Sequence, residues 1–299
     1  MGSYNGARYI SEQLQSIASQ THQHWFVVVS DDGSTDQTLR ILAEHEALWG
    51  RPKLRVQKGP GVGFSRNFLS LVCDTDIRAQ YYAFCDQDDI WETDKLSLAL
   101  EWLQTVPAGV PALYGARTRL IDDRNAEIGC SPLFKKPPSF GNALVQSIAG
   151  GNTMVFNNAA RNLLQVAGPR VDVVSHDWWA YLVVSACGGM VHYDSHPTVR
   201  YRQHCANIIG MNAGLRPKLK RIGMLLNGHF KEFTERNLNA LSKLAQCITP
   251  GNREILIAFL AMRKRPLSRA LPAYFKHGIR RQTLAGTLGL ILAALLKKI

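Results

Sequence analysis

Two short clusters of aspartates in this sequence have the spacing of a divalent-cation site. Asp86 and Asp88 lie two residues apart, and Asp31 and Asp32 form the second cluster. Carboxylates at positions i and i+2 can converge on one Mg²⁺ or Mn²⁺ ion, whose remaining ligands are phosphate oxygens and water. A diphosphate held by such a cation is a stabilised leaving group. The alternative for the first cluster is helix capping, but a cap needs one aspartate, and three within Asp86–Asp89 repel one another without a cation.

The second cluster has two interpretations. Ser34, with Gln37 three residues later, fits a capping box, so a turn followed by a helix accounts for Ser34 and Asp36. Asp31 or Asp32 would then be free to contact a nucleobase or a ribose. Both interpretations remain open at this point.

Further candidate side chains come later in the chain. Asp177 falls in the first turn of an expected helix, where the helix dipole favours its ionised form, so it could accept a proton from an attacking hydroxyl. Trp178 could offer a flat apolar face to a sugar ring. The alternative for both is a helix cap beside core tryptophans.

Arg202 could contact a diphosphate, and His204 could bind a metal or a phosphate, although a lone histidine is more often structural.

A glycine-rich loop at Gly59–Gly63 precedes Arg66 and could bring a phosphate to a helix N-terminus. The sequence contains no P-loop, no G-x-S-x-G motif and no dinucleotide fingerprint at a first strand–helix unit.

None of the six cysteines forms a C-x-x-C pair. This usage indicates reduced thiols in a cytosolic compartment rather than a zinc site or a disulfide framework.

The elements that must position these side chains alternate between strands and helices. Apolar runs at 25–30 and 81–85 are typical of buried strands, and each ends at an aspartate cluster. This alternation predicts a three-layer α/β fold with a parallel sheet, in which ligands bind at the carboxyl ends of the strands. Other strands are expected at 53–57, 112–121, 153–156 and 190–194, helices at 10–17, 34–48, 64–72, 93–103, 158–167 and 176–186, and a loop at 122–140. No strand precedes the loop at residues 1–6, so we expect the first strand to be missing upstream of residue 1.

The net charge of +12 favours polyanionic partners. From about residue 215 the sequence is helical and basic, with breaks expected at Pro266 and Pro272. Cations alternate with apolar stretches there, which suits an anionic membrane surface, and a solvated helical bundle is the alternative. The apolar run at 284–296 is too short to span a bilayer but could lie on one. The cations are Lys218, Lys220, Arg221, Lys231, Arg263, Lys264, Arg265, Arg280 and Arg281.

Five motifs, in this order, resemble the family 2 glycosyltransferases of the GT-A fold, and in particular their bacterial rhamnosyltransferase-like branch. They are Ser3–Tyr9, Ser30–Asp36, Phe84–Trp91, His176–Trp179 and Tyr201–His204. The resemblance covers about residues 3–210. It implies an α/β GT-A catalytic domain over 1–212, Rossmann-like with a mostly parallel sheet flanked by helices. A basic helical region, a candidate for membrane association, follows over 213–299.

The resemblance also implies an inverting enzyme that moves one sugar from a nucleotide-sugar to an acceptor hydroxyl. Its catalytic base would be Asp177. The donor-site residues would be Tyr4, Asn5, Asp31, Asp32, Arg66, Asp86 and Arg202. The metal site for Mg²⁺ or Mn²⁺ would be formed by Asp86, Asp88 and His204, and the acceptor side by Gly151, Asn152 and Trp178.

The donor would be a dTDP- or UDP-sugar, with rhamnose among the sugars, and the acceptor a glycan or lipid-linked glycan in O-antigen-like surface polysaccharide synthesis. The expected location is cytoplasmic, peripheral at the inner face of the plasma membrane, with no nucleic-acid partner. The Q-x-x-R-W motif of processive members is absent, which favours transfer of a single sugar.

Three alternatives stand beside this interpretation. A sugar nucleotidyltransferase would carry a glycine-rich, basic loop at the first strand–helix turn, where this sequence has Tyr4-Asn5-Gly6. A basic nucleic-acid-binding protein would use the +12 charge, but the clustered carboxylates would repel phosphates unless a cation intervened. The third is an inactive, truncated glycosyltransferase.

Overall fold

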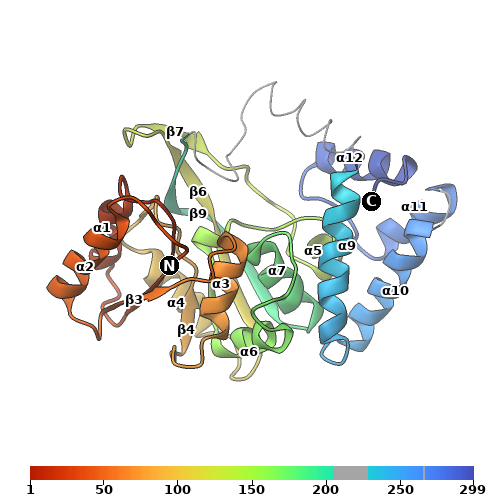
Figure 1. Ribbon diagram of the computed structural model, residues 1–299. Helices are drawn as coiled ribbons and strands as arrows, with labels where there is room; N and C mark the ends of the chain where they lie inside the picture. Colours follow the sequence, from red (N-terminus) through yellow and green to blue (C-terminus); the bar gives the residue numbers. More distant parts are fainter. Residues whose placement is uncertain (205–227, 265–266) are drawn as a thin grey trace.

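The strands of this α/β protein form two sheets with helices packed on both sides (Figure 1). The computed structural model describes residues 1–204, 228–264 and 267–299. The first sheet is parallel, in the order β1 (Gly2–Ser3), β2 (Val27–Asp31), β3 (Leu54–Lys58). The second has the order β4 (Tyr81–Ala83), β8 (Val155–Asn157), β6 (Ala112–Ile121), β9 (Met190–Arg202), β5 (Ile90–Trp91), with β7 (Glu127–Cys130) beside β6.

The predicted α/β class holds, and the parallel pairing predicted for the sheet is found in part. It holds throughout the first sheet and between β6 and β9. The β4–β8, β8–β6, β5–β9 and β6–β7 pairs are antiparallel. The core strand β2 is buried at all five positions, as expected for a β-branched run covered on both faces.

The expectation that no strand precedes the first loop was wrong. Gly2 and Ser3 pair in parallel with Ser30 and Asp31 of β2. The Gly2 amide also donates to the carbonyl of Cys85, directly after β4. This two-residue strand therefore links the two sheets at the edge where both aspartate clusters lie.

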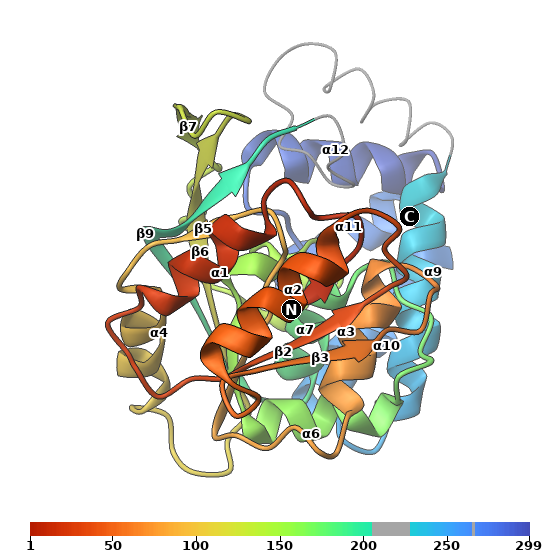
Figure 2. The same cartoon turned by 60° about the vertical axis from the view of Figure 1, so that its left-hand side comes forward.

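Helices cover these sheets as the apolar spacing predicts. The helix α1 (Ile10–Ala18) buries Ile10, Leu14 and Ile17 on one face. The helix α7 (His176–Ala186) is buried along most of its length, between the second sheet and the C-terminal helices (Figures 1 and 2). The other helices of this part are α2 (Thr38–Trp49), α3 (Phe64–Cys73), α4 (Lys95–Leu103), α5 (Phe140–Ala143) and α6 (Asn158–Ala167), with the 3-10 helices η1 (Gly151–Thr153) and η2 (Ser242–Leu244).

Two strand predictions needed correction. The segment expected to be a loop at 122–140 contains β7, which pairs with β6 through Arg119 and Cys130. The strand expected to end at Asp194 continues to Arg202. The β6–β9 ladder passes Pro197 with a register shift between Ala116 and Thr118, where a proline without an N–H can be accommodated.

The described residues of the C-terminal region, 228–264 and 267–299, are largely helical, as predicted. They contain α9 (His229–Leu241), α10 (Pro250–Lys264), α11 (Leu267–Lys276) and α12 (Leu284–Leu295). The break expected at Pro272 was wrong, because α11 continues through it to the buried Tyr274. No helix in the described part of the chain is long and apolar enough to cross a membrane. The calls on Lys218, Lys220, Arg221, Arg265 and Pro266 lie outside the described residues.

Candidate functional site

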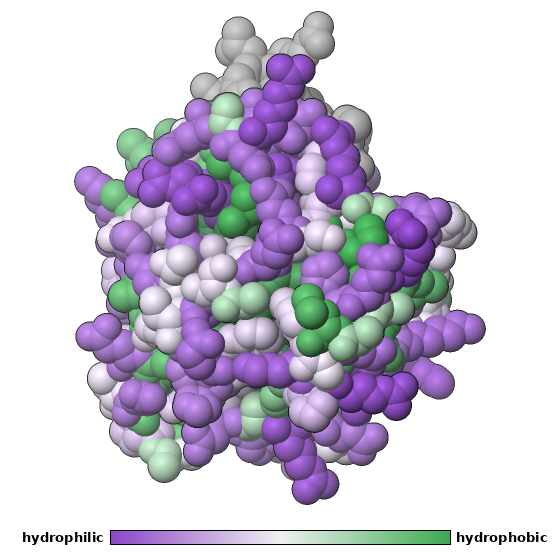
Figure 3. All heavy atoms as spheres, turned by 90° about the vertical axis from the view of Figure 1, so that its left-hand side faces the viewer, coloured by the Kyte–Doolittle hydropathy of each residue, from purple (hydrophilic) through white to green (hydrophobic). Residues whose placement is uncertain are grey.

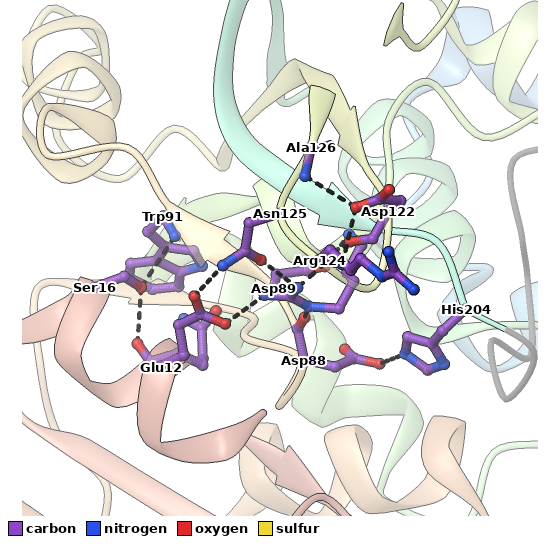
Figure 4. A network of polar contacts seen from close by, with 12 residues as sticks. Glu12, Ser16, Asp88, Asp89, Trp91, Asp122, Arg124, Asn125, Ala126 and His204 are labelled. Atoms are coloured by element: carbon purple, nitrogen blue, oxygen red, sulfur yellow. Dashed lines mark hydrogen bonds and ion pairs between the residues drawn. The ribbon is translucent and has the colours of Figure 1, made fainter. Parts of the chain in front are cut away.

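The loop after β4 carries three aspartates in three different environments. Asp89 is 1% exposed and accepts hydrogen bonds from Asn152 Nδ2 at 2.6 Å and from the Arg202 amide at 3.1 Å. The Asp88 Oδ2 atom lies 2.9 Å from His204 Nε2 (Figure 4). The carboxylate of Asp86 accepts no hydrogen bond from any residue of the described chain.

Burial of Asp86, together with the nearby charges of Asp88 and Asp177, raises the pKa of its carboxyl to about 7. The first turn of α7 faces the loop after β4, because the rings of His176 and Phe84 pack with their centroids 4.6 Å apart. Burial and the nearby charges of Asp88 and Asp86 also raise the pKa of Asp89 well above its ordinary value. The structure thus brings the predicted metal residues and the predicted base into one negatively charged site.

Arg202 organises the back of this site. Its guanidinium is 1% exposed and donates to Glu12 Oε2 at 2.5 Å, to the Asp88 carbonyl at 2.9 Å and to Asn125 Oδ1. It also lies over the ring of Tyr9, 4.5 Å from the centroid. Because these N–H groups bind protein atoms, the geometry favours a positioning role over the predicted diphosphate contact.

Asp31 and Asn5 shape the neighbouring loops. Asp31 is 4% exposed and accepts from the hydroxyls of Ser3 and Ser34 and from the amides of Gly33 and Ser34. The side-chain oxygen of Asn5 accepts the Thr35 amide at 2.8 Å. These contacts favour the turn interpretation for Asp31. Asn5 likewise stabilises the turn that contains Thr35.

Asp32 and Tyr4 are less buried than Asp31, since Asp32 is half-buried and Tyr4 is exposed. The two Asp32 oxygens accept the amides of Gly61 and Gly63 at 2.7 and 2.8 Å, so this side chain orders the glycine-rich loop. Gln87 exchanges two hydrogen bonds with the backbone of Tyr4, both 2.8 Å long. The Tyr4 ring itself is 58% exposed and therefore available for a ligand.

On the predicted acceptor side, Gly151 lies against α7. A Cβ atom on Gly151 would meet His176 Nε2 at 2.4 Å and Asp177 Cβ at 3.3 Å, so only glycine fits. Asn152 is buried and holds η1 to Asp89. Trp178 is half-buried, and its indole N–H donates to the Ala143 carbonyl at 2.7 Å.

His176 is a core residue beside the predicted base. Its ring stacks on Phe68 with centroids 4.0 Å apart, and burial lowers its pKa to about 4. The ring is therefore neutral at physiological pH and supplies an apolar wall behind Asp177.

Comparison with known proteins identifies the family. Residues 1–163 match Glycosyl transferase family 2. The chain belongs to this family. Over 265 residues this glycosyltransferase is 30% identical to the dTDP-rhamnosyl transferase RfbG of Shigella flexneri, covering 81% of this chain and 84% of RfbG. It is 34% identical over 102 residues to the putative teichuronic acid biosynthesis glycosyltransferase TuaG of Bacillus subtilis (strain 168), covering 34% of this chain and 39% of TuaG.

The fold of the glycosyltransferase is also confirmed. It resembles the crystal structure of S. aureus TarS 1-349 in complex with UDP-GlcNAc, with a TM-score of 0.56 over 92% of this chain and 87% of that one, at 17% identity. The family and the GT-A fold predicted from the five motifs are therefore correct, and with them glycosyl transfer from a nucleotide-sugar.

The carboxylates of this glycosyltransferase fit a hard divalent cation. Asp86 is a partly buried carboxylate without a hydrogen-bond donor in the described chain, and Asp88 and Asp177 add negative charge around it. The described residues contain no cluster of three or more side chains that could hold a metal by themselves. Mg²⁺ or Mn²⁺ takes one or two protein carboxylates and completes its shell with phosphate oxygens and water, so Asp86 and Asp88 fit either ion.

Sequence reasoning missed the residues that position the site. Gln87 lies between Asp86 and Asp88 in the sequence, and this position could have indicated that it belongs to the site. Tyr9, Glu12 and Asn125 contact Arg202 from α1 and from the β6–β7 turn. Nothing in their local sequence indicates these long-range contacts.

Proposed function

We propose that this enzyme is an inverting glycosyltransferase that moves a single sugar from a dTDP- or UDP-sugar to an acceptor hydroxyl in surface polysaccharide synthesis. The observation that carries the proposal is the half-buried carboxylate of Asp86, which accepts no hydrogen bond in the described chain and lies two residues before Asp88, near the first turn of α7 that carries Asp177. A crowded group of carboxylates at the strand ends suits a cation–diphosphate on one side and a proton acceptor on the other.

The donor diphosphate and its cation would be held by Asp86 and Asp88, with His204 beside Asp88. When bound, the cation would neutralise the charge that develops on the departing diphosphate. Arg66 is half-buried at the start of α3 and has no ion pair within the described chain, so it is available for the diphosphate. The exposed ring of Tyr4 would contact the nucleobase, with Asp32 holding the loop beneath it.

Asp177 would act as the base. It lies in the first turn of α7, and the acceptor hydroxyl would transfer its proton to this carboxylate. The hydroxyl oxygen would then bond to the anomeric carbon as the carbon–oxygen bond to the diphosphate breaks on the opposite side. The products are an inverted glycosidic bond and a nucleoside diphosphate.

The relatives support the choice of donor and pathway class. RfbG is named a dTDP-rhamnosyl transferase, and TuaG is named for teichuronic acid biosynthesis. We therefore propose a pyrimidine donor, with dTDP-rhamnose as the first one to test. The acceptor would be a glycan or lipid-linked glycan, met by a peripheral enzyme at the inner face of the plasma membrane.

A thermal-shift screen tests the donor site. The purified protein is heated with UDP, dTDP, GDP or CDP, each with and without Mg²⁺ or Mn²⁺. A ligand that binds only the native state raises the melting temperature according to its affinity. We expect a metal-dependent shift with dTDP or UDP that is lost in Asp88→Asn. A folded wild-type protein that shifts with none of these nucleotides contradicts the proposal.

A further inference from the structure

The last helix of the protein is apolar on its outer face as well as on its inner one. In α12, Leu290 and Ala293 point into the core, with exposed fractions of 7% and 3%. On the opposite side Leu284, Leu288 and Leu292 are 74%, 57% and 47% exposed, at the four-residue spacing of one helix face. Leu295 and Leu296 extend this row and are 59% and 42% exposed. A surface helix that is apolar all round indicates a partner on its outer side.

The charged side chains that flank this leucine row in the sequence all have one sign. The last acidic side chain in the sequence is Glu254, so no aspartate or glutamate occurs over residues 255–299. Arg280 and Arg281 precede α12, and Lys297 and Lys298 follow it directly. A row of exposed leucines between two pairs of cations is complementary to a surface that is apolar inside and anionic outside.

We infer that the outer face of α12 docks on an anionic lipid bilayer, with its leucine row in the headgroup–acyl boundary and the flanking cations at the lipid phosphates. A helix of 12 residues is too short to span the hydrocarbon, so it lies in the plane of the membrane. A second copy of the chain would bring the same cations together, which opposes self-association through this face.

The segment leading into α12 is tied to the helix that carries the proposed base. Asn142 donates to the Arg280 carbonyl at 2.8 Å, and Gln282 donates its amide to Gln146. The hydroxyl of Tyr181, one turn after Asp177 on α7, contacts Asn142 Oδ1 at 3.0 Å. These contacts connect the segment before α12, through α5, to α7, which carries the proposed base. An enzyme docked on the membrane through α12 would therefore meet a lipid-linked acceptor. This last step rests on the proposed function, whereas the docking surface does not.

The test is flotation of the full chain with vesicles of phosphatidylcholine alone or mixed with phosphatidylglycerol. The double variant Leu288→Gln/Leu292→Gln removes the centre of the row with residues that keep the helix. The control is Leu48→Gln, a single leucine that is 78% exposed on α2. Figure 1 places α2 at the opposite end of the molecule from α12, and Figure 3 shows that this end is mostly hydrophilic, with small apolar patches.

We expect the wild type and Leu48→Gln to float with anionic vesicles, less so at high salt, and the double variant to bind about tenfold more weakly or worse. Circular dichroism melting checks that all three proteins fold. Equal binding by a folded double variant overturns the inference, as does equal binding to neutral and anionic vesicles. A wild type that does not float, but forms a dimer that the double variant loses, also overturns it in favour of a second copy. Nucleotide-dependent thermal shifts, measured without vesicles, report separately on the donor site.

Discussion

Replacing Asp86 with asparagine should stabilise the metal-free protein. In the folded protein the pKa of this carboxyl is raised from 3.8 to about 7 by burial and by the charges of Asp88 and Asp177. Between those two pH values the unfolded chain binds fewer protons at this position than the folded one, so stability falls as the pH rises. The loss is absent below pH 3.8 and complete above about pH 7.

The size of the effect follows from the shift. About 1.4 kcal/mol for each pKa unit gives an upper limit of about 4 kcal/mol for this group. Asp86 is only half-buried, so water screens part of the repulsion, and we expect about 1–2 kcal/mol. For a chain of this length that corresponds to a rise in melting temperature of about 2–3 °C in Asp86→Asn.

The assay is thermal unfolding of both proteins in a chelator at pH 7.5 and at pH 5. Asp86→Asn should melt higher than the wild type at pH 7.5, and the difference should shrink at pH 5. The control is Asp31→Asn, which should melt lower because four hydrogen bonds hold the native carboxylate. An Asp86→Asn protein that melts at or below the wild-type temperature at pH 7.5 would refute the account of this site as uncompensated negative charge.

Three further predictions concern the surrounding contacts. Arg202→Lys should cost about 2–3 kcal/mol in denaturant unfolding and weaken Mn²⁺ binding, because a single nitrogen lacks the planar fork that reaches Glu12, the Asp88 carbonyl and Asn125 at once. Unchanged stability and metal affinity would contradict the positioning role. Asn152→Ala should cost about 1–3 kcal/mol in the same measurement by removing the 2.6 Å donor to Asp89, and a neutral result would contradict it. Asp177→Asn should keep nucleotide affinity in calorimetry but lower kcat by about 100-fold or more, and full turnover would disprove the base.

The sequence predicted elements well where local signals are strong. The strand β6 and the helices α6 and α7 begin and end where the apolar spacing indicates. In α6 the boundary has a local cause, because the side chain of Asn157 accepts the Ala160 amide at 3.0 Å. Prediction failed after Asp194, where pairing with β6 extends the strand, and at Pro272, where anchoring of Tyr274 in the core outweighs the local effect of a proline.

The candidate site was predictable as a set of carboxylates but not as a network. The strand-end rule brought Asp86 and Asp88 to the right edge of the sheet. The role of Arg202 depended on Glu12, which is 190 residues away in the chain. An arginine with a free guanidinium and an arginine buried among acceptors look identical in the sequence. Only the tertiary contacts distinguish them.

The central claim is tested most directly by product analysis with dTDP- and UDP-sugars, Mn²⁺ and a lipid-linked glycan fraction. We predict that the wild type releases a nucleoside diphosphate and labels the glycan with one sugar, and that Asp88→Asn and Asp177→Asn do neither while remaining folded. Release of pyrophosphate instead, or turnover by Asp177→Asn equal to that of the wild type, would contradict the account.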